Sequence, residues 1–150
     1  MQNKIPPPVW MLLFGVAMWF VADSRYAYPF ELPNRWVVIG ILVAFGAFFS
    51  VTAVRQFGKA ETTVNPLDPA KATTLVSDGI FAKSRNPMYV GLLLALGAWA
   101  IWLGSLASIA VALLFIPVLN HFQIKPEERV LRELFGDEYR EYCRNVRRWI

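Results

Sequence analysis

A short polar stretch directly before a long apolar run carries residue types that bind anions. Arg85 and Asn86 precede Pro87, and Tyr89 and Gly91 follow it. A residue before proline is displaced from the helical region of backbone space, whereas proline suits the first turn of a helix. We therefore expect Arg85 and Asn86 at a helix mouth, beside unpaired backbone N–H groups and the positive end of the helix dipole, where a carboxylate or phosphate binds. The alternative is an ordinary interfacial helix start.

A second polar group lies where the last apolar run gives way to an amphipathic segment. Glu127 and Glu128 open that segment, and Asn120 and His121 end the apolar run before it. A carboxylate accepts hydrogen bonds from ribose hydroxyls or an ammonium, and a guanidinium pairs with a carboxylate through two hydrogen bonds. Together with Arg85, this mixture suits a zwitterionic cofactor that carries a ribose. The alternative is that both glutamates only complement the dipole of a helix start.

The composition excludes several kinds of site. The chain has one cysteine and one histidine among 150 residues, so an internal disulfide and a cysteine-based metal cluster are excluded, and we predict no metal site. Neither a glycine-rich dinucleotide loop after a strand nor a phosphate-binding P-loop occurs. The net charge of +4 is typical of a membrane protein whose cytoplasmic loops are basic and face anionic lipid. We therefore predict no nucleic-acid partner.

The elements that must position these residues are predicted to be membrane helices, because hydrophobic residues make up 56% of the chain and are concentrated in runs. The predicted fold is an all-α integral membrane protein, with spans at residues 9–22, 36–54, 88–104 and 106–124. A cytoplasmic connection occupies residues 55–87, an amphipathic helical segment occupies 126–148, and 1–150 form a single domain. The first span is short for the ~20 residues that a bilayer requires, and a signal peptide is its competing interpretation.

The placement of lysine and arginine predicts the orientation. Most cations lie before the first span, in the connection 55–87 and in the tail 125–150. By the positive-inside rule, both termini and the connection are expected to be cytoplasmic, in a bacterial inner membrane. This orientation puts Arg85 and the two glutamates 127 and 128 at the same membrane face, so we expect them to be close in space although they are distant in sequence.

The C-terminal two thirds of the chain resembles a known family. The residues that carry the resemblance span about 55–150 and comprise Gly79-Ile80-Phe81, Arg85-Asn86-Pro87-Met88-Tyr89-Val90-Gly91, Pro126-Glu127-Glu128, Leu131, Phe135-Gly136, Tyr139, Tyr142, Val146 and Arg148-Trp149-Ile150. This ordered set resembles the isoprenylcysteine carboxyl methyltransferases, which are similar to the membrane phospholipid methyltransferases. The resemblance implies a membrane-embedded methyltransferase that uses S-adenosylmethionine and receives a lipid substrate from the bilayer.

The resemblance also implies roles for the two polar groups. The segment from Arg85 to Tyr89 would line the amino-acid end of the cofactor, and the two glutamates would hold the cofactor or orient the substrate. We predict Glu128 and Arg85 as catalytic residues, and a cofactor-binding set of Arg85, Asn86, Pro87, Tyr89, Gly91, His121, Glu127 and Glu128. The family often has histidine where this chain has Asn86, and an asparagine cannot transfer protons at neutral pH.

The function implied is methyl transfer from S-adenosylmethionine to a lipid-like or isoprenoid carboxylate or amine at the cytoplasmic membrane face. Such a transfer depends mainly on alignment of the two reactants and exclusion of water. Two alternatives stay open at this point. One is a membrane reductase relative that uses a nicotinamide cofactor, and the other is a non-catalytic lipid-binding membrane protein.

Overall fold

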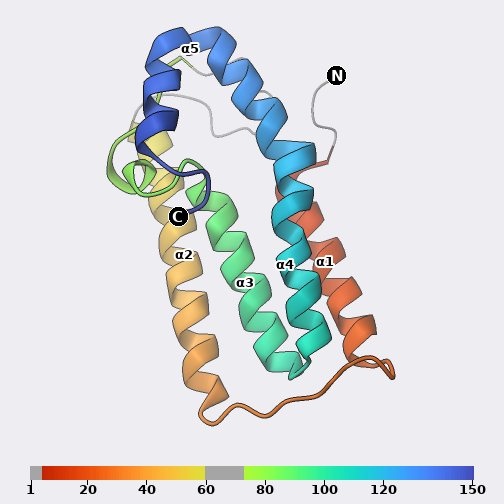
Figure 1. The fold of residues 1–150 in the computed structure, drawn as a ribbon. Coiled ribbons are helices and arrows are strands. Elements are labelled where there is room, and N and C mark those ends of the chain that lie inside the picture. Colours follow the sequence, from red (N-terminus) through yellow and green to blue (C-terminus); the bar gives the residue numbers. More distant parts are fainter. Residues whose placement is uncertain (1–4, 60–72) are drawn as a thin grey trace.

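The computed structural model describes residues 5–59 and 73–150, and within them every regular element is a helix. The four apolar helices are α1 (Pro7–Ala22), α2 (Arg35–Lys59), α3 (Pro87–Leu103) and α4 (Leu106–Leu119) (Figure 1). The 3-10 helix η2 (Gly79–Ala82), the π-helix η3 (Asn120–Ile124) and the helix α5 (Lys125–Asn145) complete the chain. Residues 60–72 of the predicted connection 55–87 lie outside the described residues.

Each predicted apolar span coincides with a helix, but the helices differ in length. By length and hydropathy, α2 and the continuous helical run Leu106–Asn145 could cross a membrane, whereas α1 and α3 have 16 and 17 residues. At 1.5 Å per residue, α3 is roughly 26 Å long, somewhat less than the ~30 Å hydrocarbon core of a bilayer. The second predicted span therefore meets the length criterion by itself, and the fourth meets it only as part of the longer helical run Leu106–Asn145.

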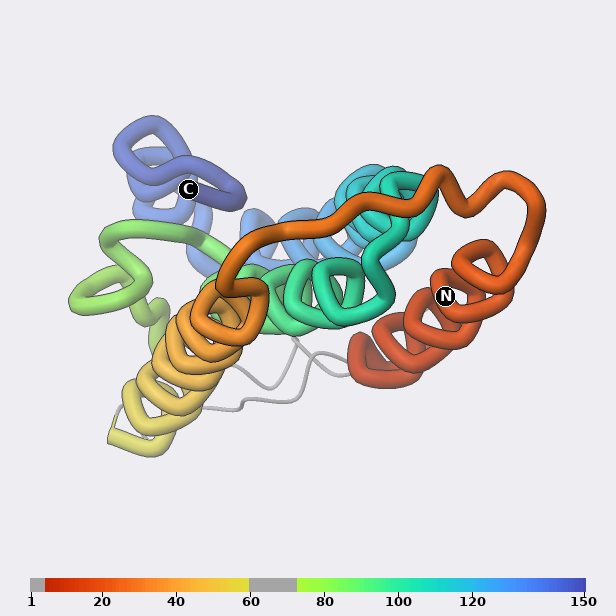
Figure 2. Tube along the Cα trace, turned by 90° about the horizontal axis from the view of Figure 1, so that it is seen from below, coloured from red at the N-terminus to blue at the C-terminus, as the bar shows by residue number. Residues whose placement is uncertain are grey.

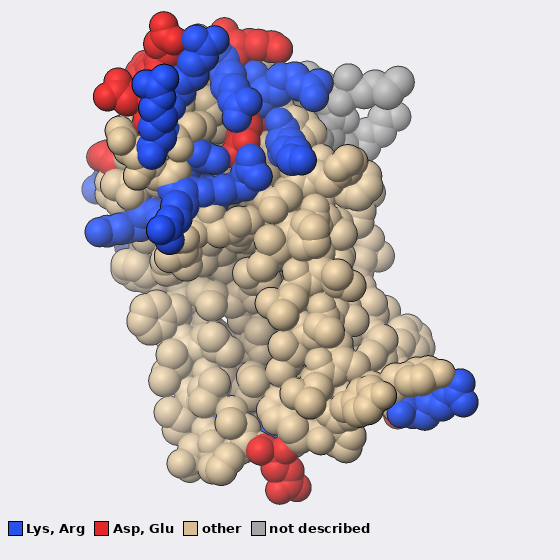
Figure 3. All heavy atoms as spheres, viewed as in Figure 1, with Lys and Arg blue, Asp and Glu red and all other residues tan. Residues whose placement is uncertain are grey.

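The apolar helices form a bundle in which α3 is central. The view from below shows α2 on one side of α3, and α1 and α4 on the other (Figure 2). Large apolar side chains cover the outside of this bundle, among them Leu12, Val37, Phe45 and Leu113. In Figure 3 the charged side chains gather at the end that carries α5, and the sides of the bundle are almost uncharged. This surface is the pattern expected of helices that face lipid.

The helices α2 and α3 approach each other closely because glycines face each other. A Cβ atom at Gly91 would lie 2.7 Å from the carbonyl oxygen of Gly46 and would overlap the side chain of Ser50. Small residues that allow backbones to approach are a common basis of helix association in lipid. The position of Gly91 in the predicted cofactor-binding set thus has a packing explanation in the fold.

The passage from α4 to α5 is a continuous helix with a wide turn inside it. Pro117 lies within α4, where it removes one helical hydrogen bond, and η3 begins three residues later. Gly136 then interrupts α5 with φ 51° and ψ −121°, a positive φ that glycine adopts at little cost. The helix ends at Asn145 rather than at the predicted residue 148, because Val146 adopts an extended conformation.

The second half of α5 packs on the end of α2 and on η2. Tyr139 and Tyr142 are buried in one apolar cluster with Ala53, Ile80 and Phe81. The hydroxyl of Tyr142 donates a hydrogen bond of 2.8 Å to the backbone oxygen of Phe81. These contacts hold α5 across the charged end of the bundle, above the first turn of α3.

Candidate functional site

The first polar group forms a tight entry into α3. Pro87 is the first residue of the helix and is buried, and the backbone of Asn86 is non-helical, with φ −132° and ψ 56°. This conformation agrees with the restriction that a proline imposes on the preceding residue. The side-chain amide of Asn86 donates to the backbone oxygen of Arg148 at 2.9 Å. The backbone N–H of Arg85 donates to the backbone oxygen of Arg147 at 3.0 Å. The residues after α5 therefore fold back along the entry to α3.

Glu128 joins the two polar groups by ion pairs. Its carboxylate oxygens accept hydrogen bonds from Arg85 Nη2 at 2.9 Å and from Arg148 Nε and Nη2 at 2.9 and 2.7 Å. Arg132, one helical turn further along α5, lies 3.6 Å away. The Glu128 side chain is 5% exposed and that of Arg85 is 11% exposed. The expectation that Arg85 and Glu128 meet in space is confirmed.

The negative charge of Glu128 is balanced by the arginines around it. Burial alone would raise the pKa of Glu128, but the hydrogen bonds from Arg148 and the charge of Arg85 outweigh it and hold that pKa below its ordinary value. Arg85 also donates through Nη1 to the backbone oxygens of Cys143 and Val146, at 3.0 and 3.2 Å. Arg85 and Glu128 thus fasten the end of α5 to the start of α3.

Glu127, the neighbouring carboxylate, faces a different environment. It accepts a hydrogen bond of 2.7 Å from the Tyr89 hydroxyl and another from the side-chain amide of Gln123. Among the described side chains, no lysine or arginine forms an ion pair with it. Burial raises the pKa of Glu127 to about 7, although both hydrogen bonds act against this shift. The two adjacent glutamates therefore differ in both partners and proton affinity.

The remaining predicted site residues separate into two kinds. Tyr89 is buried at the first turn of α3 and touches Glu127. His121 is exposed on η3, where its ring packs edge-on against Phe122 at 4.7 Å. Gly91 faces α2 in the bundle interior. The structure brings Arg85, Asn86, Pro87, Tyr89, Glu127 and Glu128 together at one end, and it leaves His121 and Gly91 outside this contact network.

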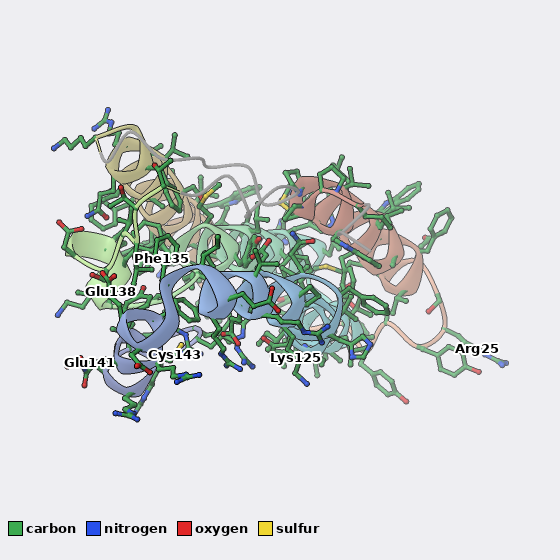
Figure 4. All side chains as sticks on the ribbon, turned by 90° about the horizontal axis from the view of Figure 1, so that it is seen from above. Arg25, Lys125, Phe135, Glu138, Glu141 and Cys143 are labelled. Carbon is green, nitrogen blue, oxygen red and sulfur yellow. The ribbon has the colours of Figure 1, made fainter. Side chains whose placement is uncertain are left out.

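Three further residues make contacts at this end of the bundle that the sequence pattern does not predict. Arg148 supplies a paired guanidinium to Glu128, Gln123 donates to Glu127, and the Trp149 indole donates to Asn120 at 3.1 Å. Arg148 lies in a basic tail that sequence patterns assign to a solvated surface. Its role depends on the reversal of the chain after α5. Figure 4 looks down on this end, where α5 runs over the bundle from Lys125 toward Cys143.

One buried donor of this network has no acceptor in the described part of the chain. Within residues 5–59 and 73–150, no atom accepts the Nε proton of Arg85, which is shielded from solvent. A buried donor without an acceptor is costly, and a ligand oxygen would satisfy it. The site thus offers a guanidinium N–H for an acidic group and the Glu127 carboxylate for a basic group. This pair suits a zwitterionic ligand.

Comparison with known proteins identifies the family of the chain. Residues 35–138 match the family model described as phospholipid methyltransferase. A protein-S-isoprenylcysteine O-methyltransferase of Schizosaccharomyces pombe is 35% identical over 69% of this chain and 44% of its own length. A probable protein-S-isoprenylcysteine O-methyltransferase of Oryza sativa subsp. indica is 30% identical over 91% of this chain and 73% of its own length.

A Haemophilus influenzae protein named only as uncharacterized is 51% identical over 42% of this chain, an alignment that covers all of that protein. No solved structure matches the chain. The family match covers more than half of the chain and includes both polar groups of the site. The predicted resemblance is confirmed, and the chain belongs to the phospholipid methyltransferase family, together with proteins named as isoprenylcysteine methyltransferases.

Proposed function

We propose that the protein is an integral membrane methyltransferase that transfers a methyl group from S-adenosylmethionine to a lipid-like or isoprenoid carboxylate or amine. The observation that carries this proposal is the meeting of two distant polar segments at one end of an apolar bundle. Arg85 contacts Glu128 at 2.9 Å, and Tyr89 contacts Glu127 at 2.7 Å. Family membership and the names of the relatives indicate a methyltransferase.

The residues of the site fit the proposed cofactor chemically. The buried Nε–H of Arg85 can donate to a carboxylate, and the Glu127 carboxylate can accept from an ammonium or a hydroxyl. S-adenosylmethionine, when bound, supplies an activated methyl group on a sulfonium. Asn86 and Pro87 shape the entry to α3 beside it. Arg85 and Glu128 act in this proposal as positioning residues, since most of their polar atoms bind each other and the end of α5.

The reaction requires little proton chemistry from the protein. A carboxylate acceptor needs no base, whereas an amine must be neutral before it attacks. The site therefore contributes mainly alignment of the reactants and exclusion of water. Tyr89 and Gln123, the described donors to Glu127, are themselves buried, which favours exclusion of water on that side of the carboxylate.

The membrane arrangement follows from the surface. We propose that α1 to α4 cross the bilayer, with the short helices α1 and α3 accommodated by local thinning or by neighbouring helices. The end that carries α5, the basic tail and both termini would face the cytoplasm of a bacterium, because the cations gather there (Figure 3). A lipid acceptor would then enter the site laterally from the bilayer.

Cofactor binding tests this proposal. Purified protein in detergent is titrated with S-adenosylmethionine, S-adenosylhomocysteine and NADPH, and binding is measured by calorimetry. The first two should bind, and Arg85→Ala should weaken their binding at least 10-fold. Arg140→Ala is the matched control, because Arg140 forms an exposed ion pair with Asp137 on the same helix as Glu128. Binding of NADPH alone, or unchanged binding by a folded Arg85→Ala variant, would refute the proposal.

A further inference from the structure

The continuous helix from α4 into α5 carries an exposed stripe along its outer side. The members of this outer stripe recur every three or four residues and are all exposed: Leu113, Pro117, His121, Lys125, Arg129 and Arg132. Residues at this spacing share one helix face. Steps of four residues overshoot an α-turn of about 3.6 residues, and the wider π-turn of η3 offsets part of this drift. The outer stripe therefore stays on one side of the molecule.

The outer stripe changes from apolar to cationic at a defined depth. It is apolar up to Pro117, with Leu113 57% exposed, and cationic from Lys125 onward. Residues 106–124 span roughly 28 Å at about 1.5 Å per residue, close to the ~30 Å hydrocarbon core of a bilayer. In the proposed membrane arrangement, Lys125 therefore lies at the depth of the lipid headgroups, and the apolar part of the outer stripe lies against acyl chains.

The cations of the outer stripe keep their charge available. Within residues 5–59 and 73–150, no carboxylate forms an ion pair with Lys125 or Arg129. The nearest acids in sequence turn inward, since Glu127 accepts hydrogen bonds from the bundle side and Glu128 is buried. Arg132 lies 3.6 Å from Glu128, but its side chain is still 53% exposed. In Figure 3 the cations border the uncharged sides of the bundle, and in Figure 4 Lys125 lies at the outer edge.

We propose that the outer stripe binds an anionic phospholipid of the cytoplasmic leaflet. Lys125 and Arg129 bind the phosphate, His121 lies beside the glycerol, and an acyl chain lies along the apolar part at Leu113. This lipid occupies a site of its own on the outside of α4 and α5. The inference depends on the proposed membrane arrangement and not on methyl transfer.

Charge and shape together select this ligand. A lysine or arginine near an anionic headgroup contributes to lipid binding, and the effect is confined to short range by salt. The headgroup of a zwitterionic lipid brings its own cation to the same place, so Lys125 and Arg129 gain less from it. A soluble phosphate compound has no chain to cover Leu113. The ligand that satisfies both parts of the outer stripe carries a net negative headgroup and a hydrocarbon chain.

The test measures lipid affinity directly. Delipidated protein in neutral detergent is titrated with phosphatidylglycerol and with phosphatidylcholine, and bound lipid is counted by native mass spectrometry. The wild type should bind phosphatidylglycerol about 10-fold more tightly, and the preference should shrink as the salt concentration rises. The double variant Lys125→Gln/Arg129→Gln should lose most of this preference. The charge-conserving variant Lys125→Arg/Arg129→Lys should keep it.

Arg55→Gln/Lys59→Gln is the matched control. These two cations are exposed on α2 at the same end of the bundle, with the same spacing and the same loss of charge, and the control should keep the preference. Equal affinity of the wild type for both lipids, or equal losses in the two glutamine variants, would overturn the inference. Loss of the preference in the charge-conserving variant, or displacement of phosphatidylglycerol by millimolar glycerol 3-phosphate, would also overturn it.

Discussion

Two adjacent carboxyl groups at the start of α5 occupy opposite electrostatic environments. Glu128 is surrounded by arginines, which lower its pKa, and Glu127 is half-buried beside neutral donors, where loss of solvent raises its pKa to about 7. Environments that push the pKa values of neighbouring acids apart are typical of sites in which each acid has its own task. Here Glu128 joins α5 to the start of α3 through its arginines, whereas Glu127 contacts neutral donors.

Removal of the Glu128 carboxylate should strongly destabilise the fold. Glu128→Ala leaves the nearly buried guanidinium of Arg85 without its anion, and loss of one partner of a buried pair costs about 3–5 kcal/mol. Thermal unfolding in detergent, followed by tryptophan fluorescence, measures this effect. The control Asp137→Ala removes an exposed ion pair with Arg140 and should leave the midpoint nearly unchanged. Equal effects of the two substitutions would contradict the structural role of Glu128.

The stability of the wild type should depend on pH through Glu127. Its folded-state pKa of about 7 lies above the ordinary value of 4.5, so its favourable contribution is complete below about pH 4.5 and is lost as the pH rises through 7. Glu127→Gln lacks this titration. The free energy of unfolding of Glu127→Gln, relative to that of the wild type, should rise between pH 5 and pH 8 by up to about 3 kcal/mol, at 1.36 kcal/mol per pKa unit.

Unfolding of both proteins across this pH range checks the linkage. The titration of Glu128 acts in the opposite direction, because its lowered pKa makes its contribution present above pH 4.5 and lost in acid. If the difference in free energy of unfolding between the wild type and Glu127→Gln stays constant from pH 5 to pH 8, the pKa of Glu127 is not raised in the folded protein.

At the scale of the elements, the position of the site depends on the tight contact between α2 and α3. Gly91 and Gly46 bring the two backbones together, and the contact fixes the first turn of α3, which holds Tyr89. Gly97 lies on the same helix but has room for a methyl group, since its nearest neighbour would be Leu42 at 3.8 Å.

Gly91→Ala should therefore separate α2 from α3. The added methyl group would meet Gly46 and Ser50, and overpacking of this kind costs about 1–3 kcal/mol. Gly97→Ala is the matched control, and it should be neutral or slightly stabilising because alanine favours a helix. Thermal unfolding compares the two variants. A Gly91→Ala variant as stable as Gly97→Ala would mean that the close contact is absent in the membrane.

The sequence predicts the elements well because each has a local cause. The apolar runs and the helix start at Pro87 follow from hydropathy and backbone preference. The joint location of Arg85 and Glu128 follows from the orientation of the spans. The clamp of Arg148 on Glu128 could not be predicted, because it depends on a reversal of the chain after Asn145. The neutral surroundings of Glu127 depend equally on tertiary packing.

For the whole molecule, the proposed topology places opposite ends of the bundle on opposite sides of the membrane. Single cysteines introduced by Arg25→Cys and Arg140→Cys in a Cys143→Ala background report on these ends, since Cys143 is the only native cysteine. In intact bacterial cells, a membrane-impermeant maleimide should label the cysteine at 25 only. Permeabilised cells should show labelling at both positions. Labelling at 140 in intact cells would reverse the proposed orientation.

Transfer of a radiolabelled methyl group distinguishes a membrane methyltransferase from a protein that only binds the cofactor or a lipid. Purified protein is incubated with methyl-labelled S-adenosylmethionine and a total bacterial lipid extract, and label is measured in the lipid phase. We expect lipid-bound label in a 1:1 ratio to S-adenosylhomocysteine formed, with at least a 10-fold loss in the Arg85→Ala variant. Absence of lipid-bound label from folded wild-type protein across all lipid fractions would contradict a membrane methyltransferase.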